Sequence, residues 1–199
     1  MTTIGFDLDM TLIDSRPGIG AALHQVAEES GHPIDVDLAT SRLGPPLAWE
    51  LAHWMPENQV DRWVERFRAI YPDVAIPAIA TLPGAVEALA AVNRIGRSLV
   101  ISAKHRPNVQ RHVDHLDLPA SAVFGDAWRE QKAVVLRAEG AAMYVGDHVH
   151  DMDAATGAGV IGIGVATGSS SADELRDAGA DLVLDTLHEF DRALALLPS

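Results

Sequence analysis

The sequence predicts an α/β protein with a doubly wound, Rossmann-like parallel sheet and a small all-helical cap inserted after the first strand. From residue 81 onward, short apolar segments rich in β-prone residues alternate with segments of helical periodicity. This alternation is typical of a parallel sheet covered on both faces. Residues 15–80 show helical periodicity only. We therefore predict a core domain formed by residues 1–14 and 81–199, and a helical cap formed by residues 15–80.

Each element of the core follows from a local pattern. Strands are expected where short apolar runs stand between turn residues: residues 3–8, 98–102, 122–124, 142–145, 160–165 and 182–184. Helices are expected between these strands: residues 84–95, 107–116, 132–139, 151–158, 171–178 and 187–196. In the cap, apolar residues at helical spacing predict helices around residues 19–27, 47–54 and 60–70, the last ending before Pro72.

Composition excludes several classes of function. The chain of 199 residues suits one domain with a modest insertion, and its formal net charge is −13 with only 15 basic residues. A nucleic acid or an anionic membrane would require a positive face, so neither is expected as a partner. Cysteine is absent, which excludes disulfides and thiolate chemistry. We see neither a secretory leader nor a membrane span, so a cytoplasmic protein is expected.

Acidic residues follow two of the predicted strands. Asp7 and Asp9 lie two apart at the end of the first strand, which places both side chains on one side of the chain. Asp147 ends another buried strand, and Asp151 follows one helical turn later. Ligands of such sheets bind beyond the carboxyl ends of the strands. Taken singly, each aspartate reads best as a helix cap or turn residue, but together they predict a Mg²⁺ site.

Cationic and hydroxyl groups are expected at the same edge of the sheet. The sequence contains two lysines, Lys104 and Lys132, although a lone lysine is most often a solvated surface residue. We favour Lys132 as the lysine of the site because it begins a helix that follows a strand. Ser102 ends a strand, and its hydroxyl could bind a phosphoryl oxygen. The nine histidines include no His-Glu-x-x-His pattern, so a zinc site is not expected.

These motifs resemble the haloacid dehalogenase superfamily, in particular its phosphoglycolate-phosphatase-like branch. The resemblance covers nearly the whole chain. Its first motif appears as FDLDMTLIDS at residues 6–15, and this motif is highly specific. The second appears as VISAK at residues 100–104, the third is Lys132, and the fourth appears as VGDHVHD at residues 145–151.

The resemblance implies a role for each matched residue. Asp7 attacks phosphorus and forms an aspartyl-phosphate, and Asp9 protonates the leaving oxygen and then activates water. Mg²⁺ is held by Asp7, by the backbone carbonyl of Asp9 and by Asp147, with Asp151 in support. The phosphate-binding residues are Ser102, Lys132 and Thr11, of which Thr11 also orients the loop after the nucleophile. The helical insertion corresponds to a mobile cap that excludes water.

Other positions depart from the family pattern or extend it. Met10 stands where the family usually has glycine, and we expect it to narrow the pocket. The cap segment RLGPPL at residues 42–47 resembles the substrate-contacting loop of relatives, which makes Arg42 and Gly44 candidate substrate residues. Trp49 and His53 either add selectivity or pack inside the cap. The roles of His148 and His150 stay open.

We therefore expect an Mg²⁺-dependent phosphatase acting on a small phosphorylated metabolite, as a monomer or a homodimer. Relatives that act as dehalogenases lack the second aspartate, so Asp9 argues against that chemistry. Phosphonatase relatives use a cap lysine, and residues 15–80 contain none. A receiver domain would be much shorter. A sugar phosphomutase and a non-catalytic protein that binds a phosphorylated ligand remain as alternatives, and the substrate itself is not identified.

Overall fold

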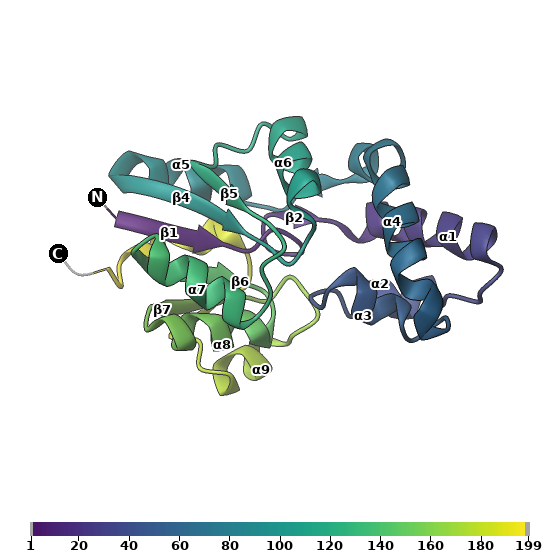
Figure 1. Cartoon of the computed structure of the whole chain (residues 1–199). Coiled ribbons are helices and arrows are strands. Elements are labelled where there is room, and N and C mark those ends of the chain that lie inside the picture. The colour runs from purple at the N-terminus through teal and green to yellow at the C-terminus, as the bar shows by residue number, and fades with distance from the viewer. Residues whose placement is uncertain (1, 198–199) are drawn as a thin grey trace.

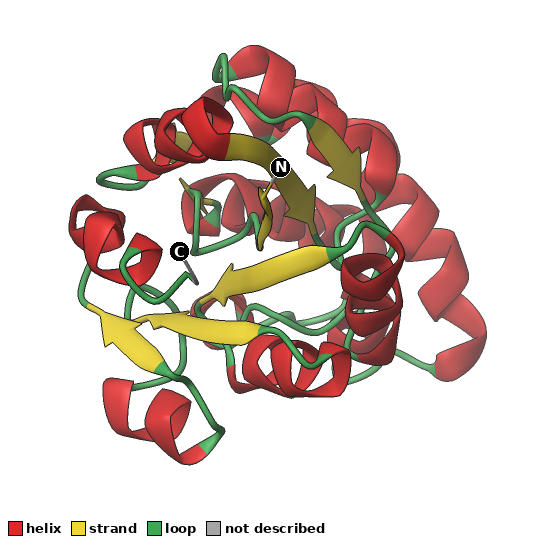
Figure 2. Ribbon diagram, turned by 90° about the vertical axis from the view of Figure 1, so that its left-hand side faces the viewer, coloured by secondary structure: helices red, strands yellow, loops and turns green. Residues whose placement is uncertain are grey.

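The computed structural model describes residues 2–197 and confirms the predicted fold class. Six parallel strands form one sheet in the order β5-β4-β1-β6-β7-β8 (Figures 1 and 2). Their bounds are Thr2–Phe6 for β1, Gly96–Ile101 for β4, Ala122–Phe124 for β5, Ala141–Gly146 for β6, Ile161–Val165 for β7 and Leu182–Leu184 for β8. The chain moves outward from β1 in both directions, so the ends of β1, β4 and β6 lie side by side at the centre of the sheet.

Helices cover both faces of this sheet, as Figure 2 shows. Their bounds are Ala85–Ile95 for α5, Arg106–His115 for α6, Glu130–Ala138 for α7, Val149–Ala158 for α8, Ala172–Asp177 for α9 and Phe190–Leu194 for α10. Successive side chains of a strand point to opposite faces. Accordingly, Leu99 and Ile101 of β4 pack in one cluster with Leu136 of α7, whereas Val100 belongs to a second cluster that contains Leu89 of α5.

The remaining helices form an insertion at one end of the molecule (Figure 1). They are α1 at Arg16–Ser30, α2 at Val36–Ser41, α3 at Leu47–Leu51 and α4 at Glu57–Val74, followed by a short 3-10 segment at Ile76–Ala78. The chain enters and leaves through β2 (Ile13–Asp14) and β3 (Ala80–Thr81), which pair antiparallel. We call residues 16–78 the helical insertion; its description as a separate cap domain stays a prediction.

One local expectation differs from the structure, and two short features were not predicted. The helix expected to end before Pro72 continues to Val74. Proline costs α4 only one backbone hydrogen bond near its end, where Ile70 and Tyr71 are buried and hold the last turn in place. The pairing of β2 with β3 was not predicted, because two-residue strands carry no periodicity. The six-residue α2 was also missed, although Asp35 caps it by accepting a hydrogen bond from the Leu38 amide.

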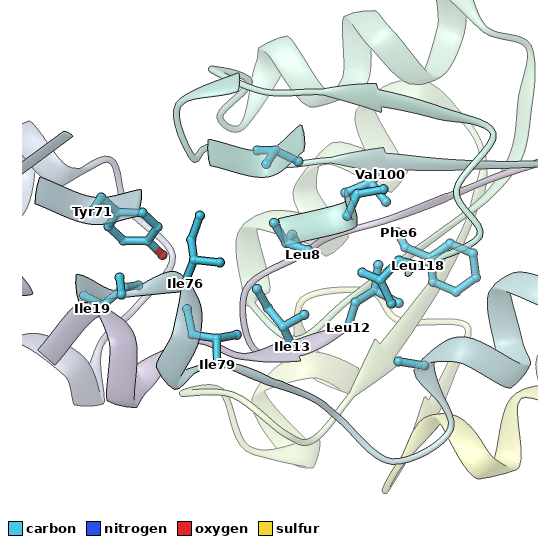
Figure 3. Packing of buried hydrophobic residues seen from close by; sticks show 14 of the residues in the cluster. Phe6, Leu8, Leu12, Ile13, Ile19, Tyr71, Ile76, Ile79, Val100 and Leu118 are labelled. Carbon is cyan, nitrogen blue, oxygen red and sulfur yellow. The ribbon is translucent and has the colours of Figure 1, made fainter. Parts of the chain in front are cut away.

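The hydrophobic core is continuous between the sheet and the helical insertion. Phe6, Leu8 and Leu12 lie in the same cluster as Ile19 and Tyr71, and Figure 3 shows this packing across the β2–β3 connection. The base of the insertion therefore rests on the first strand and the loop after it. Within residues 2–197, no helix has the length and apolar character needed to cross a membrane.

Candidate active site

Three buried aspartates meet where β1 and β6 end. The Asp7 amide donates a hydrogen bond to the Val145 carbonyl at 2.8 Å, which extends the pairing of β1 with β6 beyond the last strand residue. Asp147 follows β6, and Asp151 lies in the first turn of α8, where one of its oxygens accepts from the His148 amide at 3.1 Å. The three side chains offer carboxylate oxygens that all lie within 4.8 Å of one another. The sequence analysis assigned these three aspartates and Lys132 to one site, and the structure brings all four together.

Lys132 is the counter-ion of this cluster. Its Nζ donates to Asp7 Oδ1 at 2.7 Å and to Asp151 Oδ1 at 2.6 Å. Burial raises the pKa of Asp7 to about 7, with a smaller opposing effect of the Lys132 charge. Burial and the neighbouring Asp151 and Asp7 charges raise the pKa of Asp147 well above its usual value. One ammonium does not balance three carboxylates, so the cluster has the charge and the hard oxygen donors of a divalent-cation site.

Thr11 was expected to bind phosphate, but in the structure it contacts Asp147. The Thr11 side chain is fully buried, and its hydroxyl donates to Asp147 Oδ1 at 2.9 Å. Thr11 therefore does not line the cavity, and its observed contact supports Asp147 rather than a phosphate group. Gly168 lies against the same aspartate, because a β-carbon at this position would overlap the Asp147 carboxylate. Sequence reasoning missed Gly168; its place just after a strand was the available signal.

Lys104 is also buried in the site, where it pairs with a different aspartate, Asp9. Its Nζ forms an ion pair with Asp9 Oδ1 at 2.9 Å and donates to the Tyr71 hydroxyl at 2.7 Å. Burial opposes ionisation of Asp9, but the Lys104 charge and the hydrogen bonds to the carboxylate together outweigh it, so the pKa of Asp9 lies below its usual value. The Tyr71 hydroxyl lies 3.1 Å from Nε2 of His112. Sequence reasoning favoured Lys132 over Lys104, whereas the structure brings both lysines to the acidic pair.

Tyr71 and His112 were not identified from the sequence. Tyr71 lies on α4 of the helical insertion and His112 on α6 of the sheet domain, and both are buried. Because the Tyr71 oxygen accepts from Lys104, its own hydrogen is free to donate to a neutral His112. Burial lowers the pKa of His112 to about 4, assisted by the nearby Lys104 charge. At helical spacing, Tyr71 reads as a core aromatic residue, and no sequence signal separates it from one.

The neutral state of His112 makes stability depend on pH. Between pH 6.5 and 4, the unfolded chain binds a proton at His112 that the folded chain does not, so this residue's contribution to stability is lost as pH falls. We expect the free energy of unfolding of the wild type, relative to that of H112Q, to fall by about 2 kcal/mol between pH 7 and pH 5. Urea unfolding at both pH values measures this difference. An equal difference at the two pH values would contradict the assignment.

A cavity of about 330 Å³ lies between the sheet and the helical insertion and contains the acidic residues. From the sheet domain it is lined by Asp7, Asp9, Ser102, Lys104, Lys132, Asp147 and Asp151. The insertion contributes mainly apolar side chains, among them Ile19, Leu23, Val64 and Phe67. Ser102 directly follows β4 and is 1% exposed, and its Oγ accepts from the Lys104 amide at 3.1 Å. The cavity therefore combines an acidic and cationic floor with an apolar wall.

The two candidate substrate residues of the insertion both line this cavity. The Arg42 guanidinium donates to both oxygens of Glu50, at 2.9 and 2.8 Å, so it already has a carboxylate partner. Gly44 has a φ of 142°, and a β-carbon there would lie 2.8 Å from the His148 ring. Gly44 thus lets the insertion approach the loop after β6. The rings of Trp49 and His53 contact each other in a tilted arrangement, with centroids 4.3 Å apart, and neither residue lines the cavity.

The structure also shows where Met10, His148 and His150 lie relative to the cavity. Met10 has a φ of 61°, in the left-handed region that favours glycine, which accounts for the residue usual at this position. Its side chain is buried away from the cavity, so the expectation that Met10 narrows the pocket is wrong. His148 and His150 do line the cavity, with ring centroids 4.6 Å apart, and the His150 ring packs edge-on against Trp128.

Comparison with known proteins gives consistent matches. The family model described as "Haloacid dehalogenase-like hydrolase" matches residues 4–165. A phosphoglycolate phosphatase of Caulobacter vibrioides is 30% identical over 98% of this chain and 91% of its own length, and one of Synechococcus elongatus is 28% identical over 99% of both chains. In fold, the chain resembles a haloacid dehalogenase-like hydrolase of Streptococcus pneumoniae, with a TM-score of 0.86, 22% identity and 98% of each chain covered.

Proposed function

The chain belongs to the haloacid dehalogenase-like hydrolase family, and we propose that it is a magnesium-dependent phosphatase of small phosphate monoesters. The observation that carries the proposal is the pair Asp7 and Asp9, each held by its own buried lysine at the edge of one cavity. Two carboxylates of this kind can divide nucleophilic and acid–base work. The similarity to two phosphoglycolate phosphatases supports the same reaction.

In the first step, a carboxylate oxygen of Asp7 attacks phosphorus. The bond from phosphorus to the ester oxygen breaks, and that oxygen takes a proton from Asp9, which is ionised beside Lys104 in the free protein and acquires this proton when the substrate anion binds. The alcohol leaves, and the phosphoryl group is now bonded to Asp7. Lys132 Nζ, 2.7 Å from Asp7, places positive charge beside the transferred group, and Ser102 at the end of β4 faces the same space.

In the second step, water hydrolyses the aspartyl-phosphate. Asp9, now ionised, takes a proton from the water molecule as its oxygen attacks phosphorus. The bond between phosphorus and Asp7 breaks, inorganic phosphate is released, and both carboxyl groups return to their starting states. The apolar wall that the helical insertion forms over the cavity limits competing water, as expected for a cap.

Asp7, Asp147 and Asp151 fit a divalent cation. They offer hard oxygen donors, and burial together with the neighbouring carboxylate charges raises the pKa of Asp147. Mg²⁺ held by these residues would neutralise charge on the phosphoryl oxygens. Thr11 and Gly168 would keep the Asp147 carboxylate in place.

Binding of Mg²⁺ to the folded chain should raise its melting temperature. At a Mg²⁺ concentration 100 times the dissociation constant, the stabilisation is about 2.7 kcal/mol, which corresponds to roughly 5 to 10 °C for a chain of this size. Thermal unfolding with Mg²⁺ and with a chelator measures the shift. We expect D147N to lose most of it and D153N, an exposed aspartate on the same helix, to retain it. If D147N showed the full shift in melting temperature, Asp147 would not be a ligand of the cation.

Phosphate release from a panel of short phosphate monoesters, with Mg²⁺ or a chelator, tests the function. We expect release that depends on Mg²⁺. A hexose phosphate in the panel separates the phosphomutase alternative, because a mutase forms an isomer without free phosphate. If no ester released more phosphate with the wild type than with the D7N variant, the phosphatase proposal would be wrong and the non-catalytic alternative would be favoured.

A further inference from the structure

We propose that the helical insertion binds an apolar leaving group, and that the favoured substrates are phosphate monoesters of aliphatic alcohols with about five or six carbon atoms. The surface that binds this group is formed by α1 and α4. Sugar phosphates and polyol phosphates of the same length are then poor substrates. The inference rests on the proposed function, because Asp7 as the nucleophile determines the direction in which the leaving group points.

The leaving group points from the sheet toward the helical insertion. In phosphoryl transfer, the attacking and leaving oxygens lie roughly in line on opposite sides of phosphorus. The attacking residue, Asp7, belongs to the sheet side of the cavity, together with Asp147 and Lys132. The insertion forms the other side of the cavity. The group bonded to the ester oxygen therefore lies against the insertion.

Two helices of the insertion, α1 and α4, make this side of the cavity apolar. They pack against each other (Figure 1). Ile19 and Leu23 of α1 and Val64 and Phe67 of α4 line the cavity, and a spacing of three or four residues places each pair on one face of its helix. None of the four is more than 9% exposed. Their apolar surface in the cavity is therefore available only to a molecule that enters it.

The ion pair that the insertion brings to the cavity satisfies its own polar atoms. The Arg42 guanidinium donates to both oxygens of Glu50, at 2.9 and 2.8 Å. Trp54 Nε1 donates to Oε1 of the same carboxylate at 2.6 Å, and Glu50 is 8% exposed. Hydrogen bonds between charged groups are among the strongest in proteins. A hydroxyl group of the substrate would have to break this pair to gain a partner here.

The other polar groups of the insertion that line the cavity are also engaged. The Tyr71 hydroxyl contacts a lysine and a histidine of the sheet domain, at 2.7 and 3.1 Å. Arg68 pairs with Glu65 at 2.8 Å. Pro45 and Pro46 line the cavity but have no amide hydrogen to donate. Burying a hydroxyl group without a partner costs free energy, so this surface favours a leaving group that has none.

The size of the cavity limits the length of the leaving group. A water molecule takes up about 30 Å³ in the liquid, and a methylene group is of similar size. A cavity of about 330 Å³ therefore holds about 11 atoms of this size, of which the phosphate ester group takes about five. The remaining space fits an aliphatic chain of about five or six carbon atoms.

Matched compounds test the inference by turnover and by affinity. n-Pentyl phosphate and ribitol 5-phosphate are esters of primary alcohols with the same carbon chain, and only ribitol carries further hydroxyl groups. We expect kcat/KM to be at least about tenfold higher for pentyl phosphate. Hexylphosphonate and ethylphosphonate, which cannot be hydrolysed, report affinity by calorimetry with Mg²⁺. Affinity should rise about fourfold for each methylene group that becomes buried.

Variants of the apolar surface make the test residue-specific. V64T replaces a methyl group by a hydroxyl of similar size, and should lower the ratio of kcat/KM between pentyl phosphate and ribitol 5-phosphate about three- to tenfold. L23N, which places an amide on α1, should lower it by about tenfold or more. The matched control is V134T on α7. Val134 is 55% exposed and does not line this cavity, so its variant should keep the wild-type ratio.

Each outcome decides the inference. It is wrong if affinity does not rise from ethylphosphonate to hexylphosphonate, if the wild type hydrolyses ribitol 5-phosphate as efficiently as pentyl phosphate, or if V64T keeps the wild-type ratio. If L23N does not fold, V64T and the phosphonates decide. An affinity that rises with chain length, without release of phosphate from any ester, would support the apolar site and refute the phosphatase. Release of phosphate with a preference for ribitol 5-phosphate would do the reverse.

Discussion

Asp7→Asn should abolish phosphatase activity while leaving the protein folded. An amide cannot attack phosphorus and form the acyl-phosphate, so we expect kcat to fall by about 10⁴-fold or more. Stability should not suffer in the same way. The substitution removes one of three crowded carboxylates, and Lys132 keeps its second partner, Asp151, at 2.6 Å. Phosphate release and thermal unfolding, both measured with a chelator and with Mg²⁺, separate these two effects.

The matched control is Asp114→Asn. Asp114 lies on α6, accepts a hydrogen bond from Gln110 and is exposed, so its variant should keep activity within about twofold. Asp9→Asn provides the complementary experiment when the substrate is an aryl phosphate, because such a leaving group needs no acid in the first step, while the base of the second step is removed. Mass spectrometry of the acid-quenched D9N variant should then detect a phosphoryl group on Asp7. Retention of more than 1% of wild-type activity by D7N would contradict the assignment of the nucleophile.

Lys132→Met should damage both stability and activity. The methionine side chain fills similar space but leaves Asp7 and Asp151 without their shared counter-ion inside a buried cluster. Removing one partner of a buried ion pair costs about 3 to 5 kcal/mol, so we expect the free energy of unfolding to fall by this amount without Mg²⁺. Activity should fall by at least 10²-fold, since positive charge beside the transferred phosphoryl group is lost. Urea unfolding and phosphate release measure the two effects.

Mg²⁺ should partly restore the stability of K132M, because a cation in the same cluster compensates the same carboxylates. Arg137→Met on the same helix is the control; Arg137 is exposed and donates to the Gly157 carbonyl. Its variant should lose no more than about 1 kcal/mol. Equal destabilisation of K132M and R137M would show that Lys132 does not compensate the acidic cluster.

The fold was largely predictable because its signals are local. The strands Ala122–Phe124 and Leu182–Leu184 have the predicted bounds, and the other strands and helices of the sheet domain agree within a few residues. A buried strand between two amphipathic helices leaves its pattern in a few consecutive residues. The pairing of Ile13–Asp14 with Ala80–Thr81 was not predictable in this way, since it joins two short segments across the whole helical insertion.

The position of the acidic residues was also readable from the sequence. Asp7 and Asp147 follow strands, and the carboxyl ends of parallel strands share one edge, so their meeting follows from topology alone. Thr11 shows the limit of the same reasoning. Its place in the motif was evident, but the direction of its hydroxyl, toward Asp147, depends on the course of the loop after β1.

The sequence by itself determined the fold class, the family and the edge of the sheet where the aspartates gather. Only the tertiary structure decided which partner each charged group has: Lys104 with Asp9 and Tyr71, Lys132 with Asp7, and Arg42 with Glu50. The physical reason is that a strand or a helix is encoded by neighbouring residues, whereas the site's two buried lysines meet aspartates 95 and 125 positions away, since 104 − 9 = 95 and 132 − 7 = 125. Their pairing is set by how α4, α6 and α7 pack against the central strands.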